Sequence, residues 1–170
     1  MNNPDLNNPD LHNPYETDEL LNQYLGFHYG RDYFGVPNYA AACAELCLQF
    51  MGKRPKRRAL DLGCAVGRST FELAVGFEHV EGVDLSHRFV EAARRLKAGE
   101  SLDYFLHEEG ELGSMAHASL DALECKAAAG RTEFFVDDAC NLDAQRTGYD
   151  LIFAGNLVDR VNNPAAFLGS

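Results

Sequence analysis

The chain is poor in basic residues. Its 170 residues hold 15 lysines and arginines against 26 aspartates and glutamates, which gives a formal net charge of −11 at pH 7. This negative field repels a phosphate backbone, so we expect no nucleic-acid partner. A single basic run at residues 53–58 stands just before the first expected strand, at the edge of the sheet opposite the expected ligand, and we interpret it as a solvated loop.

Paired cysteines and long apolar runs are lacking too. Five cysteines occur, none of them in a Cys-x-x-Cys pair, and this usage fits a reducing cytosol better than a disulfide scaffold. His107 lies near glutamates without the spacing of a metal-binding motif, so we expect no metal. Because there is neither a signal peptide nor an apolar run of membrane length, we expect a cytoplasmic protein with no membrane contact.

The most informative stretch lies at residues 58–74. It contains a short apolar segment that resembles a buried strand, a turn with Gly63 and Gly67, and helical spacing from Ser69 onward. A strand that leads into a helix through glycines places backbone N–H groups at the helix start, where α/β sheets bind nucleotide-like ligands. The turn lacks the Gly-Lys-Ser/Thr ending of a P-loop, and Ala65 stands where a dinucleotide fingerprint has its middle glycine.

Three later segments have the pattern of buried strands that end in polar residues. The first ends in Asp84, whose carboxylate could accept both hydroxyls of a ribose, and the second ends in Asp138, suited to an adenine amino group. We therefore predict an α/β fold with helices on both faces of a parallel sheet in the order 3-2-1-4, with right-handed crossovers. The predicted strands are 59–62, 79–84, 133–137 and 149–154.

The remaining segments are less regular. Residues 1–14 repeat Asn-Asn-Pro-Asp-Leu and predict a flexible segment ahead of a domain at 15–170. Between helical patterns at 15–24 and 39–51, three glycines interleave with aromatic residues, which favours a flexible segment that closes over a small ligand; the alternative is a surface strip packed on the core. Further on, the pattern allows an extra strand at 102–106, a turn at 108–111 and a helix at 119–129.

Seven short motifs resemble those of one family. They read NPYETD at 13–18, QYLGFHYG at 23–30, YFGVPN at 33–38, DLGCAVGRS at 61–69, EGEL at 109–112, DACNL at 138–142 and GNLVDR at 155–160. Together they look like the mercaptohistidine N-methyltransferases of ovothiol biosynthesis, which are class I S-adenosylmethionine-dependent methyltransferases. The resemblance covers residues 13–168 and implies a Rossmann-like fold, S-adenosylmethionine as cofactor, and an imidazole nitrogen of 4-mercaptohistidine (5-thiohistidine) as methyl acceptor.

The resemblance also implies partners. Domains of this family occur alone or fused to an iron-dependent sulfoxide synthase, so a homodimer, or an association with such a synthase, is the assembly that it suggests. The sequence stops at Ser170, where methyltransferases normally continue through three more strands, and we expect the C-terminal strands to be missing.

Two sets of site residues follow from matching the motifs. In the first set, Asp61 is expected to bind the charged methionine part of the cofactor. Asp84 is expected to bind the ribose, and Asp138 the adenine. The expected cofactor-binding residues are Asp61, Gly63, Cys64, Ala65, Gly67, Arg68, Asp84, Leu85, Asp138, Ala139 and Asn156. The expected acceptor-binding residues are Tyr24, His28, Tyr29, Asn156, Asp159 and Arg160, with catalytic roles for Asn156, Asp159 and Tyr29 and with Asp159 able to take the departing proton.

Two other functions stay open at this point. The chain could be a class I methyltransferase for another small molecule, or a non-catalytic module that binds the cofactor or serves as a scaffold. In each case we expect the aromatic segment at 24–39 to fold over the carboxyl ends of the strands and to face Asn156 and Asp159, because it precedes the helix that leads to the first strand.

Overall fold

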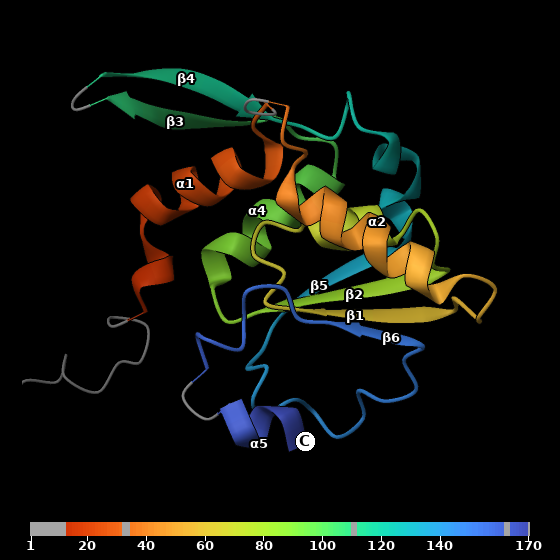
Figure 1. Cartoon of the computed structure of the whole chain (residues 1–170). Coiled ribbons are helices and arrows are strands. Elements are labelled where there is room, and N and C mark those ends of the chain that lie inside the picture. The colour runs from red at the N-terminus through yellow and green to blue at the C-terminus, as the bar shows by residue number, and fades with distance from the viewer. Residues whose placement is uncertain (1–12, 32–34, 110–111, 162–163, 170) are drawn as a thin grey trace, which may run out of the picture.

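A parallel sheet forms the centre of the molecule. The computed structural model describes residues 13–31, 35–109, 112–161 and 164–169 (Figure 1). Four parallel strands lie in the order β5-β2-β1-β6, with bounds β1 Arg58–Leu62, β2 His79–Asp84, β5 Thr132–Val136 and β6 Leu151–Phe153. In chain order this is the predicted 3-2-1-4 arrangement, with β1 in the middle.

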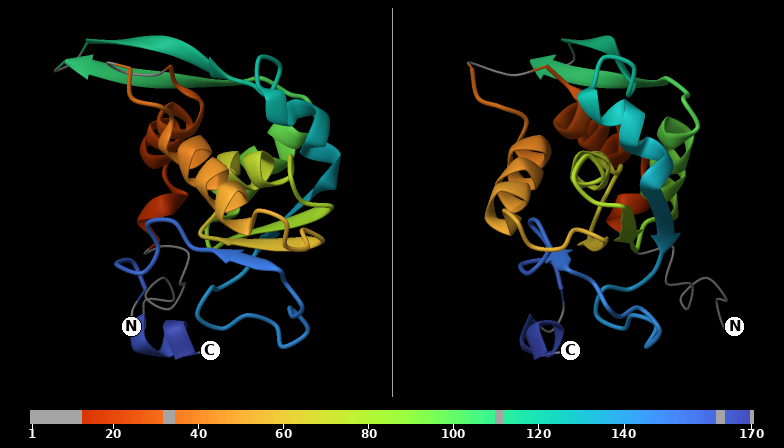
Figure 2. Two further views of the ribbon diagram at one scale, coloured as in Figure 1. Left: turned by 45° about the vertical axis from the view of Figure 1, so that its right-hand side comes forward. Right: turned by 90° about the vertical axis from the view of Figure 1, so that its right-hand side faces the viewer.

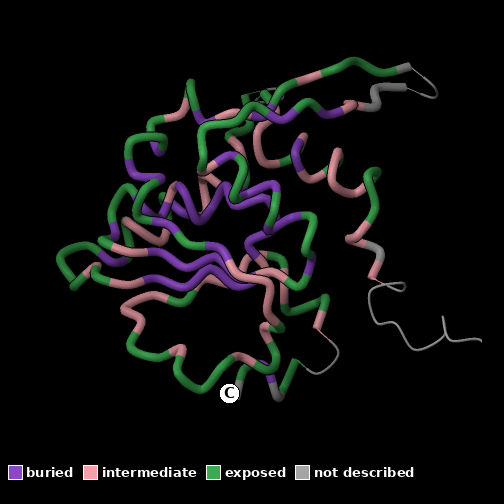
Figure 3. The backbone as a smooth tube through the Cα atoms, turned by 180° about the vertical axis from the view of Figure 1, so that it is seen from behind, coloured by how far each residue is buried: buried purple, intermediate pink, exposed green. Residues whose placement is uncertain are grey.

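The inner strands are the most deeply buried part of the chain. Residues 59–62 of β1 and 80–83 of β2 are buried, as expected for parallel strands covered on both faces (Figure 3). β6 is shorter than the predicted strand 149–154, and it begins directly after Asp150, whose side chain binds the backbone at the start of β1. That carboxylate accepts hydrogen bonds from the backbone N–H groups of Arg57 (2.8 Å) and Arg58 (3.3 Å).

Helices cover both faces of the sheet, as the sequence predicts. α1 (Asp18–Tyr29), α2 (Tyr39–Met51), α3 (Arg68–Leu73) and α4 (His87–Lys97) lie on one side, and α5 (Pro164–Gly169) lies on the other (Figures 1 and 2). Each of the three longer helices begins at a side chain that accepts a backbone N–H, which is the usual N-cap. The caps are Thr17 for α1, Asn38 for α2 and Ser86 for α4.

Helix α1 corrects the prediction of a flexible glycine segment from residue 25. The helix runs on through Gly26 to Tyr29, and Gly30 ends it by donating its N–H to the carbonyl of Gly26. Gly26 packs against Tyr104 and Leu106, so a tertiary contact outweighs the low helix propensity of glycine. Residues 32–34 of the predicted segment, and nearly all of the predicted flexible segment 1–14, lie outside the described residues.

A hairpin follows α4, where the sequence predicts one strand and a turn. β3 (Leu102–Glu109) and β4 (Leu112–Ala118) pair antiparallel and project from the body of the molecule (Figures 1 and 2). The predicted strand at 102–106 is therefore present but longer. The predicted helix at 119–129 is wrong, because a 3-10 helix, η4, occupies Glu124–Arg131. None of the described helices has the length and apolar content that a membrane span needs.

Candidate functional site

A cavity of about 590 Å³ opens at the carboxyl ends of the strands. This is the edge at which open α/β sheets bind their ligands. Its wall combines the strand ends with α1 and the start of α2. Among the residues that line it are Tyr15, Tyr24, Phe27, His28, Tyr39, Gly63, Ala65, Asp84, Leu85, Asp138, Ala139, Asn156 and Arg160.

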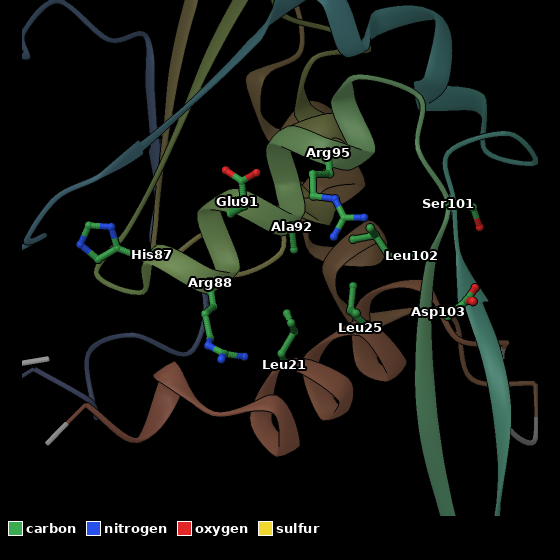
Figure 4. Close-up of a pocket in the computed structure, with 10 residues that line it drawn as sticks. All are labelled: Leu21, Leu25, His87, Arg88, Glu91, Ala92, Arg95, Ser101, Leu102 and Asp103. Atoms are coloured by element: carbon green, nitrogen blue, oxygen red, sulfur yellow. The ribbon is translucent and has the colours of Figure 1, made fainter. Parts of the chain in front are cut away.

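A second cavity of about 580 Å³ lies on the outer side of the helices, between α1, α4 and β3 (Figure 4). Leu21 and Leu25 form part of its wall, and two arginines of α4 lie at it. Both arginines are already paired, Arg88 with Asp18 and Arg95 with Glu100. None of the predicted site residues lines this cavity, so we place the functional site at the strand ends.

The turn after β1 is shaped by backbone conformations that side chains rarely adopt. Gly63 and Gly67 have φ angles of 72° and 86°, and Ala65 also has a positive φ of 47°. The N–H of Gly63 donates to the carbonyl of Val83 at the end of β2, 2.8 Å away. A Cβ on Gly67 would lie 2.8 Å from the ring of Phe134, so no larger residue fits there. The turn is therefore held tightly against β2, with Gly63 and Ala65 at the cavity wall.

Asp84 connects this turn to the helix after β2. Its carboxylate accepts the N–H groups of Ala65 and Ser86, each at 2.9 Å, and burial raises its pKa. A carboxylate has about four lone-pair positions, and two of them are used here. Because Asp84 lines the cavity, the remaining positions can accept hydroxyl groups of a ligand.

Asp61 lies behind the turn and does not line the cavity. The carboxylate accepts hydrogen bonds from the hydroxyls of Ser69 (2.6 Å) and Thr70 (2.7 Å) at the start of α3. Burial raises the pKa of Asp61 to about 6, although the two hydroxyls oppose this rise. Its contact with the methionine part of a cofactor stays a prediction, whereas its place in the fold is to hold α3 against β1.

The other predicted cofactor residues also fall into two groups, those that line the cavity and those that lie behind its wall. Leu85, Asp138 and Ala139 line the cavity beside the ends of β2 and β5. Cys64 is buried in the core, and Arg68 binds Glu72 at 2.7 Å instead of facing the cavity. The sequence thus found the strand ends correctly but could not separate residues in the wall from residues behind it.

Another part of the cavity wall is aromatic. Tyr24, Phe27 and His28 reach it from α1, and Tyr39 reaches it from the start of α2. The hydroxyl of Tyr39 donates to the amide oxygen of Asn156, 3.2 Å away, in the turn after β6. As predicted, the aromatic segment lies over the strand ends and faces Asn156, although it does so as a helix and not as a flexible loop.

Two predicted acceptor residues lie elsewhere. Tyr29 is half-buried, and its hydroxyl donates to the carbonyl of Val66, 2.8 Å away, within the glycine turn. Successive residues on a helix point about 100° apart, so Tyr29 faces the turn while His28 faces the cavity. Asp159 does not line the cavity and pairs with Arg160 (3.3 Å). Neither residue lines this cavity, and their contacts with an acceptor stay predictions.

Arg160 is the only arginine or lysine among the residues that line this cavity. Its guanidinium donates to the hydroxyl of Tyr15 at 3.1 Å. Tyr15, Phe27 and Tyr39 also line the cavity, although the sequence motifs do not predict them as site residues. The abundance of aromatic residues pointed to the segment, but only the helix phase shows which rings face the cavity.

Comparisons with known proteins agree with this geometry. The family model described as a methyltransferase domain matches residues 60–170. The search of the curated proteins gives no match. A putative S-adenosylmethionine-dependent methyltransferase from Methanococcus maripaludis superimposes with a TM-score of 0.62 at 15% identity, over 93% of this chain and 58% of that one.

Two further solved structures have the same fold. Phosphoethanolamine N-methyltransferase 2 of Haemonchus contortus, in complex with phosphomonomethylethanolamine and S-adenosylhomocysteine, gives a TM-score of 0.59 at 18% identity, over 93% of this chain and 30% of that one. Magnesium protoporphyrin IX methyltransferase of Synechocystis, with S-adenosylmethionine bound, gives a TM-score of 0.54 at 15% identity. The match covers 91% of this chain and 64% of that one. The chain spans less than two thirds of the length of each protein, and at these identities the likeness establishes the fold.

Proposed function

The chain belongs to the methyltransferase domain family, and from this premise we propose that it moves the methyl group of S-adenosylmethionine to an imidazole nitrogen of 4-mercaptohistidine. The observation that carries the proposal is that one cavity is lined by two chemically different groups of residues. Carboxylates and a glycine turn make up one group, and aromatic rings with His28, Asn156 and Arg160 make up the other.

The residues of the first group fit the cofactor. Asp84 has lone-pair positions left for ribose hydroxyls, and Asp138 lies at the next strand end for an adenine amino group. Gly63 lines the cavity, and a Cβ on it would lie 3.1 Å from the side chain of Leu157, so a larger residue would crowd the wall here. Bound S-adenosylmethionine supplies a methyl group already activated by its sulfonium, so the protein has mainly to align the acceptor atom with it. Two solved methyltransferases with this fold hold the cofactor or its product.

The residues of the second group fit a small flat acceptor with an acidic group. Tyr24, Phe27 and Tyr39 offer ring faces and edges for an imidazole. Arg160 can bind a carboxylate through charge-assisted hydrogen bonds, and Asn156 can bind an amino or ring N–H group. The protein must present a ring nitrogen and turn the more nucleophilic sulfur away. Polar groups fixed at several points around the ring provide that kind of selection.

The direct test is a methylation assay on the purified full chain with 4-mercaptohistidine, read by mass spectrometry. We expect a product heavier by one methylene unit, with fragments that place the methyl group on the imidazole and not on sulfur. Histidine, which lacks the sulfur, is the matched control and should react far more slowly.

Calorimetry with S-adenosylhomocysteine separates the ways in which the proposal can fail. Binding of the product without methylation of 4-mercaptohistidine would overturn the assigned acceptor and leave the cofactor in place. Absence of any binding would overturn the cofactor assignment as well.

A further inference from the structure

A buried carboxylate lies within the sheet and not in the cavity wall. Glu81 stands on the inner strand β2, and 8% of its side chain is exposed. Its carboxylate accepts hydrogen bonds from Arg58 (2.6 Å), Arg146 (2.5 Å) and the hydroxyl of Tyr149 (3.0 Å). Burial favours its neutral form, but these donors together hold the pKa of Glu81 below its ordinary value. A charge kept inside a sheet in this way depends on its partners, since the loss of one leaves it uncompensated.

Arg146 connects this carboxylate to the cavity wall. It belongs to the connection between β5 and β6, which runs below the sheet in Figure 1. Besides its bond to Glu81, it donates through Nε to the carboxylate of Asp137, 3.3 Å away. Its guanidinium lies 4.3 Å from the centre of the Phe135 ring. Asp137 lines the cavity with 27% of its side chain exposed, whereas Arg146, which is 15% exposed, stands behind the wall.

The bridge holds the wall segment, residues 137–140, which follows β5 and lines the cavity. The N–H of Asp137 donates to the carbonyl of Asp84 at 3.1 Å, so these two acidic residues stand at adjacent strand ends. The N–H of Asp138 donates to the carboxylate of Asp137 at 2.9 Å, and the N–H of Cys140 donates to the carboxylate of Asp138 at 2.8 Å. A shift of the Asp137 carboxylate would therefore move the backbone of the whole wall segment.

We propose that Arg146 is a positioning residue for the cofactor: by bridging Glu81 and Asp137 it fixes the wall segment against which the nucleoside part of S-adenosylmethionine binds. The inference rests on the proposed function and extends it to a residue outside the cavity. The bridge acts on charge as well as on position. Asp84 and Asp137 are like charges at neighbouring strand ends, and the guanidinium behind the wall offsets one of them.

The same network also contributes to stability, so the tests need a control that separates the two effects. Tyr149→Phe is the matched control, because it removes another hydrogen bond to Glu81 and leaves the bond between Arg146 and Asp137 in place. Arg146→Met keeps an unbranched side chain that can lie on Phe135 and has no donor. Arg146→Lys keeps the positive charge but not the planar fork that reaches both carboxylates.

The first test needs no ligand. Hydrogen exchange of the full chain, read by mass spectrometry, is compared for the wild type, Arg146→Met and Tyr149→Phe. We expect exchange in a peptide that covers residues 137–142 to be roughly tenfold faster in Arg146→Met, because the wall segment opens more easily, and nearly unchanged in Tyr149→Phe. Unchanged exchange in Arg146→Met, or an equal acceleration in both variants, would overturn the proposal.

The second test measures affinity for S-adenosylhomocysteine by calorimetry, at a temperature where circular dichroism shows each variant to be folded. We expect Arg146→Met to bind roughly tenfold more weakly, the range of a lost charge-assisted hydrogen bond, and Arg146→Lys to lie between it and the wild type. Tyr149→Phe should bind as the wild type does. Wild-type affinity in Arg146→Lys and Arg146→Met, or an equal loss in Tyr149→Phe, would refute the positioning role. If Arg146→Met does not fold, the Lys variant decides in the same way.

A double-mutant cycle shows whether Arg146 acts through Asp137. In Asp137→Ala the bridge has no contact with the wall, so adding Arg146→Met should leave the affinity for S-adenosylhomocysteine unchanged. The added change should still lower the midpoint of thermal unfolding, because Glu81 loses a donor. A further tenfold loss of affinity in the Asp137→Ala background would overturn the proposal, since Arg146 would then act by another route.

Adenosine locates the effect within the cofactor, because it has the nucleoside and lacks the amino-acid chain. We expect Arg146→Met to weaken adenosine and S-adenosylhomocysteine by the same factor, and an unchanged adenosine affinity would contradict the nucleoside contact. Wild-type protein that binds neither molecule would overturn the proposed cofactor and the role of Arg146 together. Wild-type protein that binds both, with Arg146→Met equally tight, would overturn the role of Arg146 alone.

Discussion

Removing the charge of Asp61 should change how the stability of the protein depends on pH. Asp61 is buried, and the rise of its pKa to about 6 comes mainly from that burial. Measured from an ordinary aspartate pKa near 4, a rise of about two pH units corresponds to about 3 kcal/mol between the two protonation states. The native state binds the proton more tightly than the unfolded chain does. Ionised Asp61 therefore lowers the free energy of unfolding above about pH 6, and this loss is recovered as the pH falls toward about 4.

The matched variant is Asp61→Asn, which keeps an oxygen for the hydroxyls of Ser69 and Thr70 and has no charge to titrate. Urea unfolding at several values between about pH 4 and pH 7 gives the free energy of unfolding of both proteins. Their difference cancels the titration of all other groups. We expect the variant to gain about 2–3 kcal/mol relative to the wild type across this range as the pH rises. Parallel pH curves for the two proteins would refute the reasoning, because Asp61 would then titrate alike in the folded and unfolded chains.

Other changes probe the cavity and its turn. Asp84→Ala should weaken binding of S-adenosylmethionine by about 2–3 kcal/mol in calorimetry, because charge-assisted hydrogen bonds are lost; an unchanged affinity would remove Asp84 from the cofactor site. Asn156→Ala should slow methylation of 4-mercaptohistidine while S-adenosylmethionine affinity stays nearly the same, and a parallel loss of both would place Asn156 on the cofactor side. Gly67→Ala should lower the midpoint of thermal unfolding, since its φ is positive and its Cβ would press on Phe134; an unchanged midpoint would mean that the ring moves aside without cost.

The sheet was predictable because its strands carry local signals. Apart from Asp61, residues 59–62 are apolar, as a covered parallel strand requires, and Asp84 and Asp138 mark the points where strands leave the core. The second strand of the hairpin was missed because its sequence mixes small and polar residues. Its pairing with β3 is local in the sequence, from Glu109 with Leu112 to Leu102 with Ala118, but no alternation of apolar and polar residues marks it as a strand.

Within the site, the sequence located segments better than single side chains. Tyr29 and Tyr39 belong to the same aromatic stretch and have the same functional group. One lies behind the glycine turn and the other reaches Asn156. Tyr29 is the last residue of α1 and Tyr39 the first of α2, so the difference depends on where each helix lies over the strand ends. Since a helix rotates each residue by about 100°, an error in where it ends changes which rings face the cavity.

The pairing of the central strand also determines when the protein can fold during its synthesis. Ala59 lies between Val80 on one side and Leu151 on the other, so one flank of β1 can pair about 20 residues later and the other only about 90 residues later. Until the ribosome releases Leu151, the backbone N–H and C=O groups along that flank have no strand to pair with. Domains dominated by such distant pairings fold slowly, and their unpaired strand edges are prone to aggregation until folding is complete. Codon choice and chaperone supply between the synthesis of Val80 and that of Leu151 should therefore govern the yield of folded sheet.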